Sequence, residues 1–208
     1  MFDEPRPVLG IDPGLSRCGY GAIVRESSAR VRAVCCGVLR TDPELELPQR
    51  LAILADDLES LLREVQPAVV VVERVLFQVN ARTAISVGQA SGLALMTAAR
   101  HGIPVIQYSP NEVKLAIAGD GGAGKDEVAA MVVRMLKLQT TPKPADATDA
   151  LALALCHAWR ARVPAASARE LEASIARNAN GVAMNAGVST NRRLEQRIAT
   201  AVSKRRSS

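Results

Sequence analysis

Four carboxylates in this 208-residue chain stand where acidic side chains can do chemistry: Asp12, Glu73, Asp146 and Asp149. Asp12 follows the apolar run Val8–Ile11 and precedes Pro-Gly, which predicts a buried strand that stops at a turn. By itself an aspartate in this setting is also typical of a simple turn cap. The catalytic interpretation therefore depends on the other three residues.

Glu73 ends a second apolar run, in which Ala68 is followed by four consecutive valines. Such a run predicts a strand that is buried on both faces. A carboxylate at the end of that strand is costly unless it is paired, hydrogen-bonded or bound to a metal. If the strands of Asp12 and Glu73 are parallel neighbours, the two carboxylates lie side by side.

Asp146 and Asp149 open an Ala/Leu-rich helix that is predicted to run from Ala145 to about Arg162. Residues three apart share one face of a helix, so the two like charges repel. Acidic residues in a first turn also interact with the helix dipole without any further role. A shared cation would relieve the repulsion.

An acidic cluster without His or Cys favours hard cations such as Mg²⁺ or Mn²⁺. Two such ions, about 3.5–4 Å apart, can clamp the attacking water and the leaving oxygen of a phosphodiester displacement. Four basic residues near the carboxylates could hold flanking phosphates: Arg74, Arg82, Lys114 and Lys125. The Gly-rich stretch 119–124 before Lys125 is not a P-loop, because it follows a helix and lacks Ser/Thr after the lysine.

The pattern of apolar residues predicts an α/β fold. Two antiparallel hairpins are expected to open the chain, and helices are expected to alternate with strands after them. The predicted strands are 8–11, 19–25, 30–40, 68–73 and 104–108, and the predicted helices are 47–65, 81–100, 109–119, 126–138 and 145–162.

Two segments have alternative interpretations. The helix 81–100 is rich in small residues, with Gly88 and Gly92 four apart, and could pack closely against the sheet or against a second subunit. The loop before it carries Leu76 and Phe77, which are either a local plug or a surface for a partner.

Composition limits the remaining possibilities. Hydrophobic residues make up 48% of the chain, yet no apolar run approaches the roughly 20 residues of a membrane helix. The four cysteines show no C-x-x-C spacing, so we expect a reduced, cytoplasmic protein without structural zinc. The entire net charge of +5 lies in residues 163–208, which predicts a folded domain over 1–162 and a basic, flexible tail over 163–208.

Five motifs in order resemble the RuvC family of crossover-junction endodeoxyribonucleases. They cover about residues 8–160 and read GIDPGLSRCGYG (10–21), VVVVERVLFQVNARTA (69–84), GQASG (88–92), NEVKLAIAG with GKDEV (111–128) and DATDALALA (146–154).

The resemblance implies an RNase H-like fold with a five-stranded mixed sheet flanked by helices. It implies a homodimer that resolves four-way (Holliday) junction DNA by symmetric, metal-dependent nicks in recombination and repair, with the RuvA–RuvB branch-migration complex as partner. Asp12, Glu73, Asp146 and Asp149 match the family's metal ligands, and Lys114 and Lys125 match its DNA-contacting lysines. Two Mg²⁺ ions are expected per site, with Mn²⁺ as a possible substitute.

One position departs from the family pattern. The family often carries an aromatic residue three positions after the glutamate, where it stacks on junction bases. This chain has Leu76 there and Phe77 next.

Three rival functions fit parts of the pattern. An ATPase of the sugar kinase, actin and Hsp70 type shares the first motif but needs a second lobe for which 208 residues leave no room. A non-catalytic junction-binding protein would not need all four carboxylates. An RNase H-fold nuclease acting on another branched DNA or on RNA–DNA hybrids is separated from the resolvase only by the family match.

Overall fold

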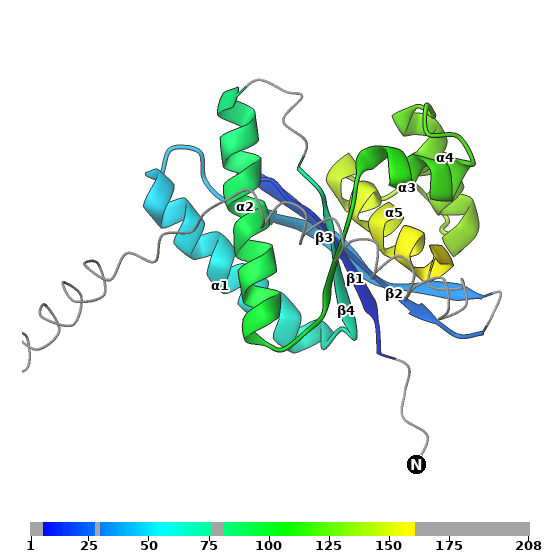
Figure 1. Ribbon diagram of the computed structural model, residues 1–208, viewed down its shortest axis with the longest axis horizontal. Coiled ribbons are helices and arrows are strands. Elements are labelled where there is room, and N and C mark those ends of the chain that lie inside the picture. The colour runs from blue at the N-terminus through cyan, green and yellow to red at the C-terminus, as the bar shows by residue number, and fades with distance from the viewer. Residues whose placement is uncertain (1–5, 28–29, 76–80, 161–208) are drawn as a thin grey trace, which may run out of the picture. The chain divides into compact units, whose positions relative to one another are not determined.

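The computed structural model describes residues 6–27, 30–75 and 81–160, and only the backbone of residues 81–83. This described part contains five strands and five helices, which confirms the predicted α/β class. The helices lie on both sides of a twisted sheet (Figure 1). The predicted tail, 163–208, lies outside the described residues, as do Leu76 and Phe77.

The described strands form one mixed sheet in the order β3-β2-β1-β4-β5. Its first three strands, β1 (Val8–Asp12), β2 (Arg17–Arg25) and β3 (Val31–Arg40), run antiparallel, as predicted from the short polar links between them. The four-valine strand β4 (Val69–Glu73) pairs with β1 in parallel, and β5 (Val105–Tyr108) pairs with β4 in parallel. The prediction of a central position for the four-valine strand is therefore confirmed.

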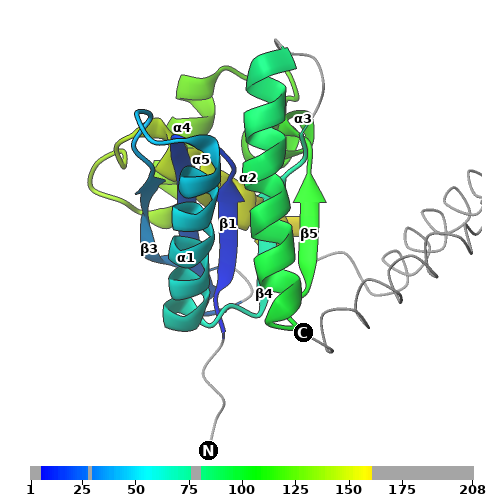
Figure 2. The same cartoon turned by 90° about the vertical axis from the view of Figure 1, so that its left-hand side faces the viewer.

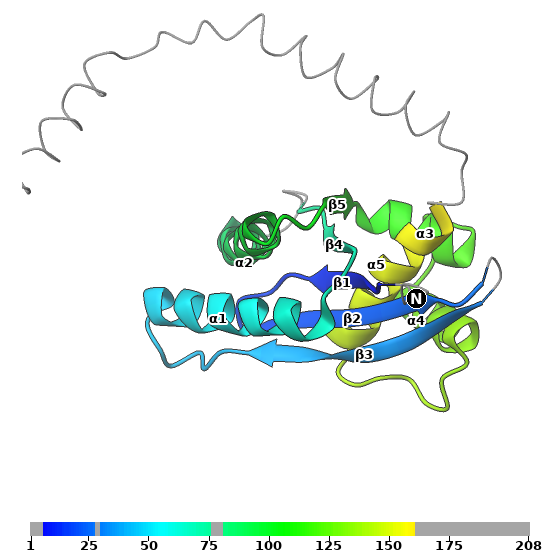
Figure 3. The same ribbon diagram turned by 90° about the horizontal axis from the view of Figure 1, so that it is seen from below.

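The helices form two layers. Helices α1 (Leu47–Val65) and α2 (Ala81–Arg100) cover one face of the sheet (Figure 2). Helices α3 (Pro110–Ala118), α4 (Lys125–Leu136) and α5 (Ala145–Arg160) cover the other face (Figure 3). Helix α4 begins one residue earlier and ends two residues earlier than predicted. None of the helices in the described ranges combines the length and apolar character needed to cross a membrane.

The side chains of the interior strands pack alternately into two separate cores, because successive side chains of a strand point to opposite faces. Leu9 and Ile11 of β1 pack with Leu54 of α1 on one side. Val71 of β4 packs with Leu151 of α5 on the other side. All five of these side chains are fully buried, so both cores fix the positions of the strand ends.

Helix α3 has the start and stop signals that its sequence predicts. The Ser109 hydroxyl accepts a hydrogen bond from the Glu112 backbone N–H, and the Glu112 carboxylate accepts one from the Ser109 backbone N–H. Pro110 occupies the first turn, and Gly119 ends the helix at φ +80°. These caps fix the position of the short helix that carries Lys114.

Helix α5 approaches the sheet so closely that only glycine fits beneath it. A Cβ at Gly10 would lie 2.0 Å from the Ala150 carbonyl oxygen, and one at Gly19 would lie 2.1 Å from the Asp146 carbonyl oxygen. Both of these contacts are to helix backbone, which cannot move without shifting the helix. The glycines of the first motif therefore serve to place α5 directly on β1 and β2.

Candidate active site

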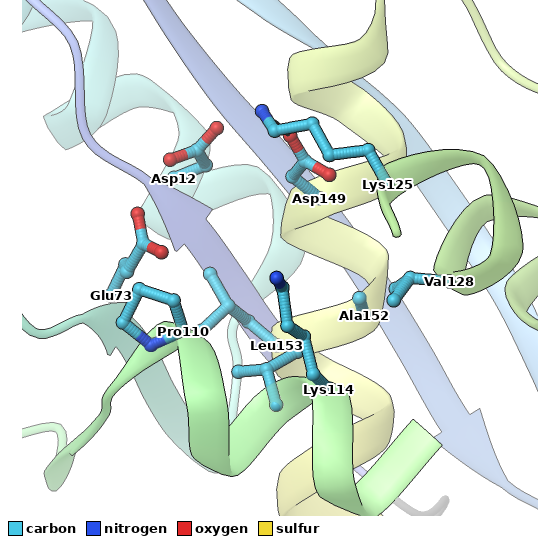
Figure 4. A pocket seen from close by; sticks show the side chains of 10 residues that line it. Asp12, Glu73, Pro110, Lys114, Lys125, Val128, Asp149, Ala152 and Leu153 are labelled. Carbon is cyan, nitrogen blue, oxygen red and sulfur yellow. Dashed lines mark ion pairs between the residues drawn. The ribbon is translucent and has the colours of Figure 1, made fainter. Parts of the chain in front are cut away.

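The two carboxylates that end strands lie at the same edge of the sheet. Ile11 of β1 pairs in register with Val72 of β4, so Asp12 and Glu73 are the next residues of two parallel neighbours. The prediction that their strand ends lie side by side is confirmed. Both side chains line one pocket, and Figure 4 shows them facing it from adjacent strands.

Helix α5 brings the other two carboxylates to this edge. Asp149 lines the same pocket as Asp12 and Glu73. Asp146 lies one turn earlier and is close enough to raise the pKa of Asp12, but it does not line the pocket. Its backbone rests on Gly19 of β2, so the close approach of α5 is what brings the helix carboxylates near the strand carboxylates.

Burial and mutual repulsion make this cluster unfavourable as four free anions. Burial raises the pKa of Asp12 to about 8, and the neighbouring charges of Glu73, Asp149 and Asp146 add to the effect. Burial also raises the pKa of Glu73. Nearby positive charge is therefore needed before all the carboxylates can ionise together near neutral pH.

Two basic side chains supply part of that charge. The Lys125 Nζ lies 3.5 Å from the Asp149 Oδ2, and Figure 4 shows the lysine reaching over that carboxylate. The Arg17 Nε lies 3.6 Å from the Asp146 Oδ2. Lys125 was predicted from the sequence as a basic residue near the carboxylates, whereas Arg17 was not. The signal available in the sequence was its position at the start of the strand that follows Asp12.

The structure places the other predicted basic residues differently. Lys114 lines the pocket with the carboxylates. Arg74 instead lies 3.8 Å from Glu112 and donates a hydrogen bond to the Gln107 carbonyl oxygen. The side chain of Arg82 lies outside the described residues.

Glu112 connects three elements around the site. Its carboxylate lies 3.3 Å from the Arg160 guanidinium at the end of α5 as well as near Arg74 after β4. The guanidinium of Arg160 also stacks over the ring of Tyr108 at the end of β5. The carboxyl end of the sheet is thus fixed to both α3 and α5. The sequence alone indicates for Glu112 only the cap at the start of α3.

The donor set fits a hard divalent cation. Carboxylate oxygens are the ligands that Mg²⁺ and Mn²⁺ prefer, and a cation would remove the repulsion that raises the pKa of Asp12. Within the described ranges, no three His, Cys, Asp or Glu side chains already stand together as a ligand group.

Comparison with known proteins agrees with this architecture. The family model for crossover junction endodeoxyribonuclease RuvC matches residues 8–157. A RuvC of that name from Leifsonia xyli subsp. xyli is 52% identical over 160 residues, covering 77% of each chain. Another, from Paenarthrobacter aurescens, is 51% identical over 154 residues, covering 74% of this chain and 82% of its own.

Solved structures show the same fold. The structure of T. thermophilus RuvC in complex with Holliday junction substrate superposes with a TM-score of 0.71 at 37% identity, covering 76% of this chain and 95% of its own. A yeast mitochondrial Holliday junction resolvase shares the fold at 17% identity with a TM-score of 0.55, covering 76% and 82% of the two chains.

A mixed five-stranded sheet with carboxylates at one edge, together with these neighbours, defines the class of nucleases with an RNase H-like fold. The sequence relatives narrow the assignment. The chain belongs to the family of the crossover junction endodeoxyribonuclease RuvC, as its motifs predicted.

Proposed function

We propose that this chain resolves Holliday junctions in DNA recombination and repair by nicking two opposing strands. The observation that supports this most directly is the grouping of Asp12, Glu73 and Asp149 with Lys114 and Lys125 around one pocket. Anionic groups alone would repel a phosphodiester, so the same pocket must also attract cations. Both requirements suit a phosphodiesterase, and the family supplies the substrate class.

We propose that Asp12, Glu73, Asp146 and Asp149 hold two Mg²⁺ ions per site, for which Mn²⁺ can substitute. Bound ions of this kind polarise the phosphodiester and supply a nucleophilic water at neutral pH. The residues of the chain orient the substrate. Asp12 and Glu73 would be rigidly placed ligands, because the strands that carry them are buried. Asp146 and Asp149 would complete the ligand set from helix α5.

The two pocket lysines have a separate task. Lys114 and Lys125 place ammonium groups on the α3 and α4 side of the carboxylates, where they can hold phosphates next to the cut. We propose further DNA contacts from the segment that follows β4, through Leu76, Phe77 and Arg82. Arg74 is about half exposed and can contribute if it leaves Glu112.

Helix α2 carries a surface suited to a second copy of the chain. Ile85 and Met96 are 61% and 45% exposed, and a Cβ added at Gly88 or Gly92 would meet no described atom within 4 Å outside the surrounding helix backbone. These four residues share one helix face, and the glycines allow another helix to come close. We propose that this face forms the homodimer, which would set two active sites against opposing strands.

The dimer proposal can be tested by light scattering. Ile85→Glu places a charge on the α2 face and should give a monomer, while Val34→Glu, at a 46% exposed residue of β3, should leave the dimer intact. A dimeric Ile85→Glu protein would exclude this face.

Two further parts of the proposal rest on the family and on the composition of the chain. We propose that the protein acts in the cytoplasm with the RuvA–RuvB branch-migration complex. We also propose that residues 1–162 are the nuclease domain and that 163–208 are a flexible basic tail.

The decisive experiment is cleavage of a synthetic four-way DNA junction in Mg²⁺ and in EDTA, with linear duplex and an RNA–DNA hybrid as controls. Symmetric nicks on the junction that require Mg²⁺ are expected. Cutting of the hybrid in preference to the junction would change the substrate while keeping the metals. Binding without cutting would make the protein a non-catalytic junction binder.

A further inference from the structure

Two arginines continue the active-site edge of the sheet beyond the carboxylates. In the register of the sheet, Asp12 of β1 faces Gly19 of β2, and two residues further along the strand Arg17 faces Arg40 of β3. Both arginines are exposed, and the side chain of Arg17 is 57% accessible. Because directly opposed residues of antiparallel strands point to the same face, the two guanidiniums share one surface.

The positive charge of this pair is poorly compensated. Within the part of the chain that the structure describes, Asp146 is the one ion-pair partner of Arg17, and Arg40 has none. An ion pair whose arginine is mostly in water contributes little, so another anion can displace it. Like charges directly opposite each other in a sheet are unfavourable. Binding of an anion between them would remove that repulsion.

A network of hydrogen bonds fixes the backbone next to the two arginines. Arg50 of α1 donates to the Ser16 hydroxyl at 2.6 Å and to the Thr41 hydroxyl at 3.0 Å. Thr41 in turn donates to the Leu15 carbonyl oxygen at 2.6 Å. The residue before Arg17 is thus tied to the residue after Arg40, which fixes the separation of their backbones.

Besides Asp146 next to Arg17, acidic residues follow Arg40 in the chain. Asp42, Glu44 and Glu46 follow Arg40 in the loop that leads to α1, and all three are exposed. The Asp42 carboxylate accepts a hydrogen bond from the Glu44 backbone N–H, so it belongs to its own loop. Arg17 is the member of the pair that lies next to the active-site carboxylates, through its contact with Asp146.

We propose that Arg17 and Arg40 bind phosphates of the DNA strand on the β2–β3 side of the cut, a contact separate from Lys114 and Lys125. This inference rests on the proposed function. Neighbouring strands lie about 4.8 Å apart, so the arginines stand about one and two strand spacings from β1. Guanidinium groups bind phosphate oxygens through two parallel hydrogen bonds, which suits them to follow a DNA backbone.

The test measures junction binding without cutting. Binding of a labelled four-way junction to the full-length protein is followed by anisotropy in EDTA over salt from about 50 to 300 mM, where phosphate contacts set the slope. Arg17→Gln and Arg40→Gln should each weaken binding about tenfold and reduce the slope of log affinity against log salt by about one. Arg17→Lys and Arg40→Lys, which keep the charge, should retain most of the slope.

The control residue, Arg32, lies on the same strand as Arg40. Arg32→Gln removes an exposed arginine at the other end of β3, where it pairs with Glu26 at 2.9 Å, and should change neither affinity nor slope. Slopes unchanged in both Gln variants, or an equal loss in Arg32→Gln, would overturn the assignment while the proposed function stood. A wild-type protein that binds no junction would instead overturn the proposed function. Circular dichroism checks that each variant is folded.

Discussion

Asp12 and Glu73 stand at the ends of strands, whereas Asp146 and Asp149 stand on a helix. The two pairs differ in their electrostatic surroundings. Burial raises the pKa values of the strand pair, and neither of its carboxylates has an ion-pair partner among the described residues. In the helix pair, by contrast, each carboxylate faces a basic side chain. The strand pair therefore has the stronger need for a cation, because the helix pair already has partial charge compensation.

The largest expected effect tests the strand pair. Asp12→Asn keeps the shape of the side chain but removes a charged ligand, so cleavage should fall by about 10³-fold or more. Junction binding should persist because Asp12 contacts no phosphate in this proposal. Asp56→Asn, an exposed change on α1, is the matched control and should cut normally. Cleavage by Asp12→Asn at the control rate would remove Asp12 from the site.

The second prediction separates the two pairs. Gly19→Ala places a methyl group 2.1 Å from the Asp146 carbonyl oxygen, so α5 must shift away from β2. We expect a loss of about 3 kcal/mol in the free energy of unfolding, measured in urea, together with reduced cleavage. Gly121→Ala, where the nearest atom would be 3.7 Å away, should be nearly neutral. Equal stability of the two variants would show that the close approach of α5 does not depend on glycine.

The third prediction concerns the energetic cost of the strand pair. The pKa of Asp12 is raised to about 8, so the folded state binds a proton that the unfolded state releases near pH 4. Stability of the wild type should therefore fall as the pH rises from about 4 to about 8 in the absence of metal. Asp12→Asn lacks this penalty and should be more stable in EDTA, on the order of 2 kcal/mol at pH 8.5 and less at pH 5.5.

The measurement is thermal unfolding of both proteins at the two pH values. Added Mg²⁺ should then stabilise the wild type more than the variant, because the ion favours the ionised carboxylate. A difference in melting temperature between the two proteins that does not change with pH would contradict the raised pKa.

The smallest expected effect concerns Lys114, which forms no ion pair with either pair of carboxylates among the described contacts. Its side chain lines the pocket. Lys114→Ala should lower cleavage about tenfold through lost phosphate attraction, and the loss should grow smaller at high salt. Lys137→Ala, at the exposed far end of α4, should have no effect. A loss as large as that of Asp12→Asn would give Lys114 a more direct role.

Much of the fold follows from local sequence. Helix α1 matched its predicted bounds because its apolar spacing is regular and Pro67 follows its end. The five strands could be predicted because their residues either alternate between apolar and polar or are uniformly apolar. Element ends differed by a residue or two, as at α4, which was predicted to begin at Asp126 and begins at Lys125 after the N-cap Gly124.

The sequence by itself determined which residue types are available: four carboxylates, two pocket lysines and the glycines between them. It also determined that Asp12 and Glu73 end strands, because apolar runs stop there. Only the tertiary structure decided which cations face which carboxylates. The pairs of Arg17 with Asp146 and of Lys125 with Asp149 join residues more than twenty positions apart. Such pairs depend on how closely α5 packs on the sheet, and this distance is set by backbone contacts at Gly10 and Gly19 that no local pattern encodes.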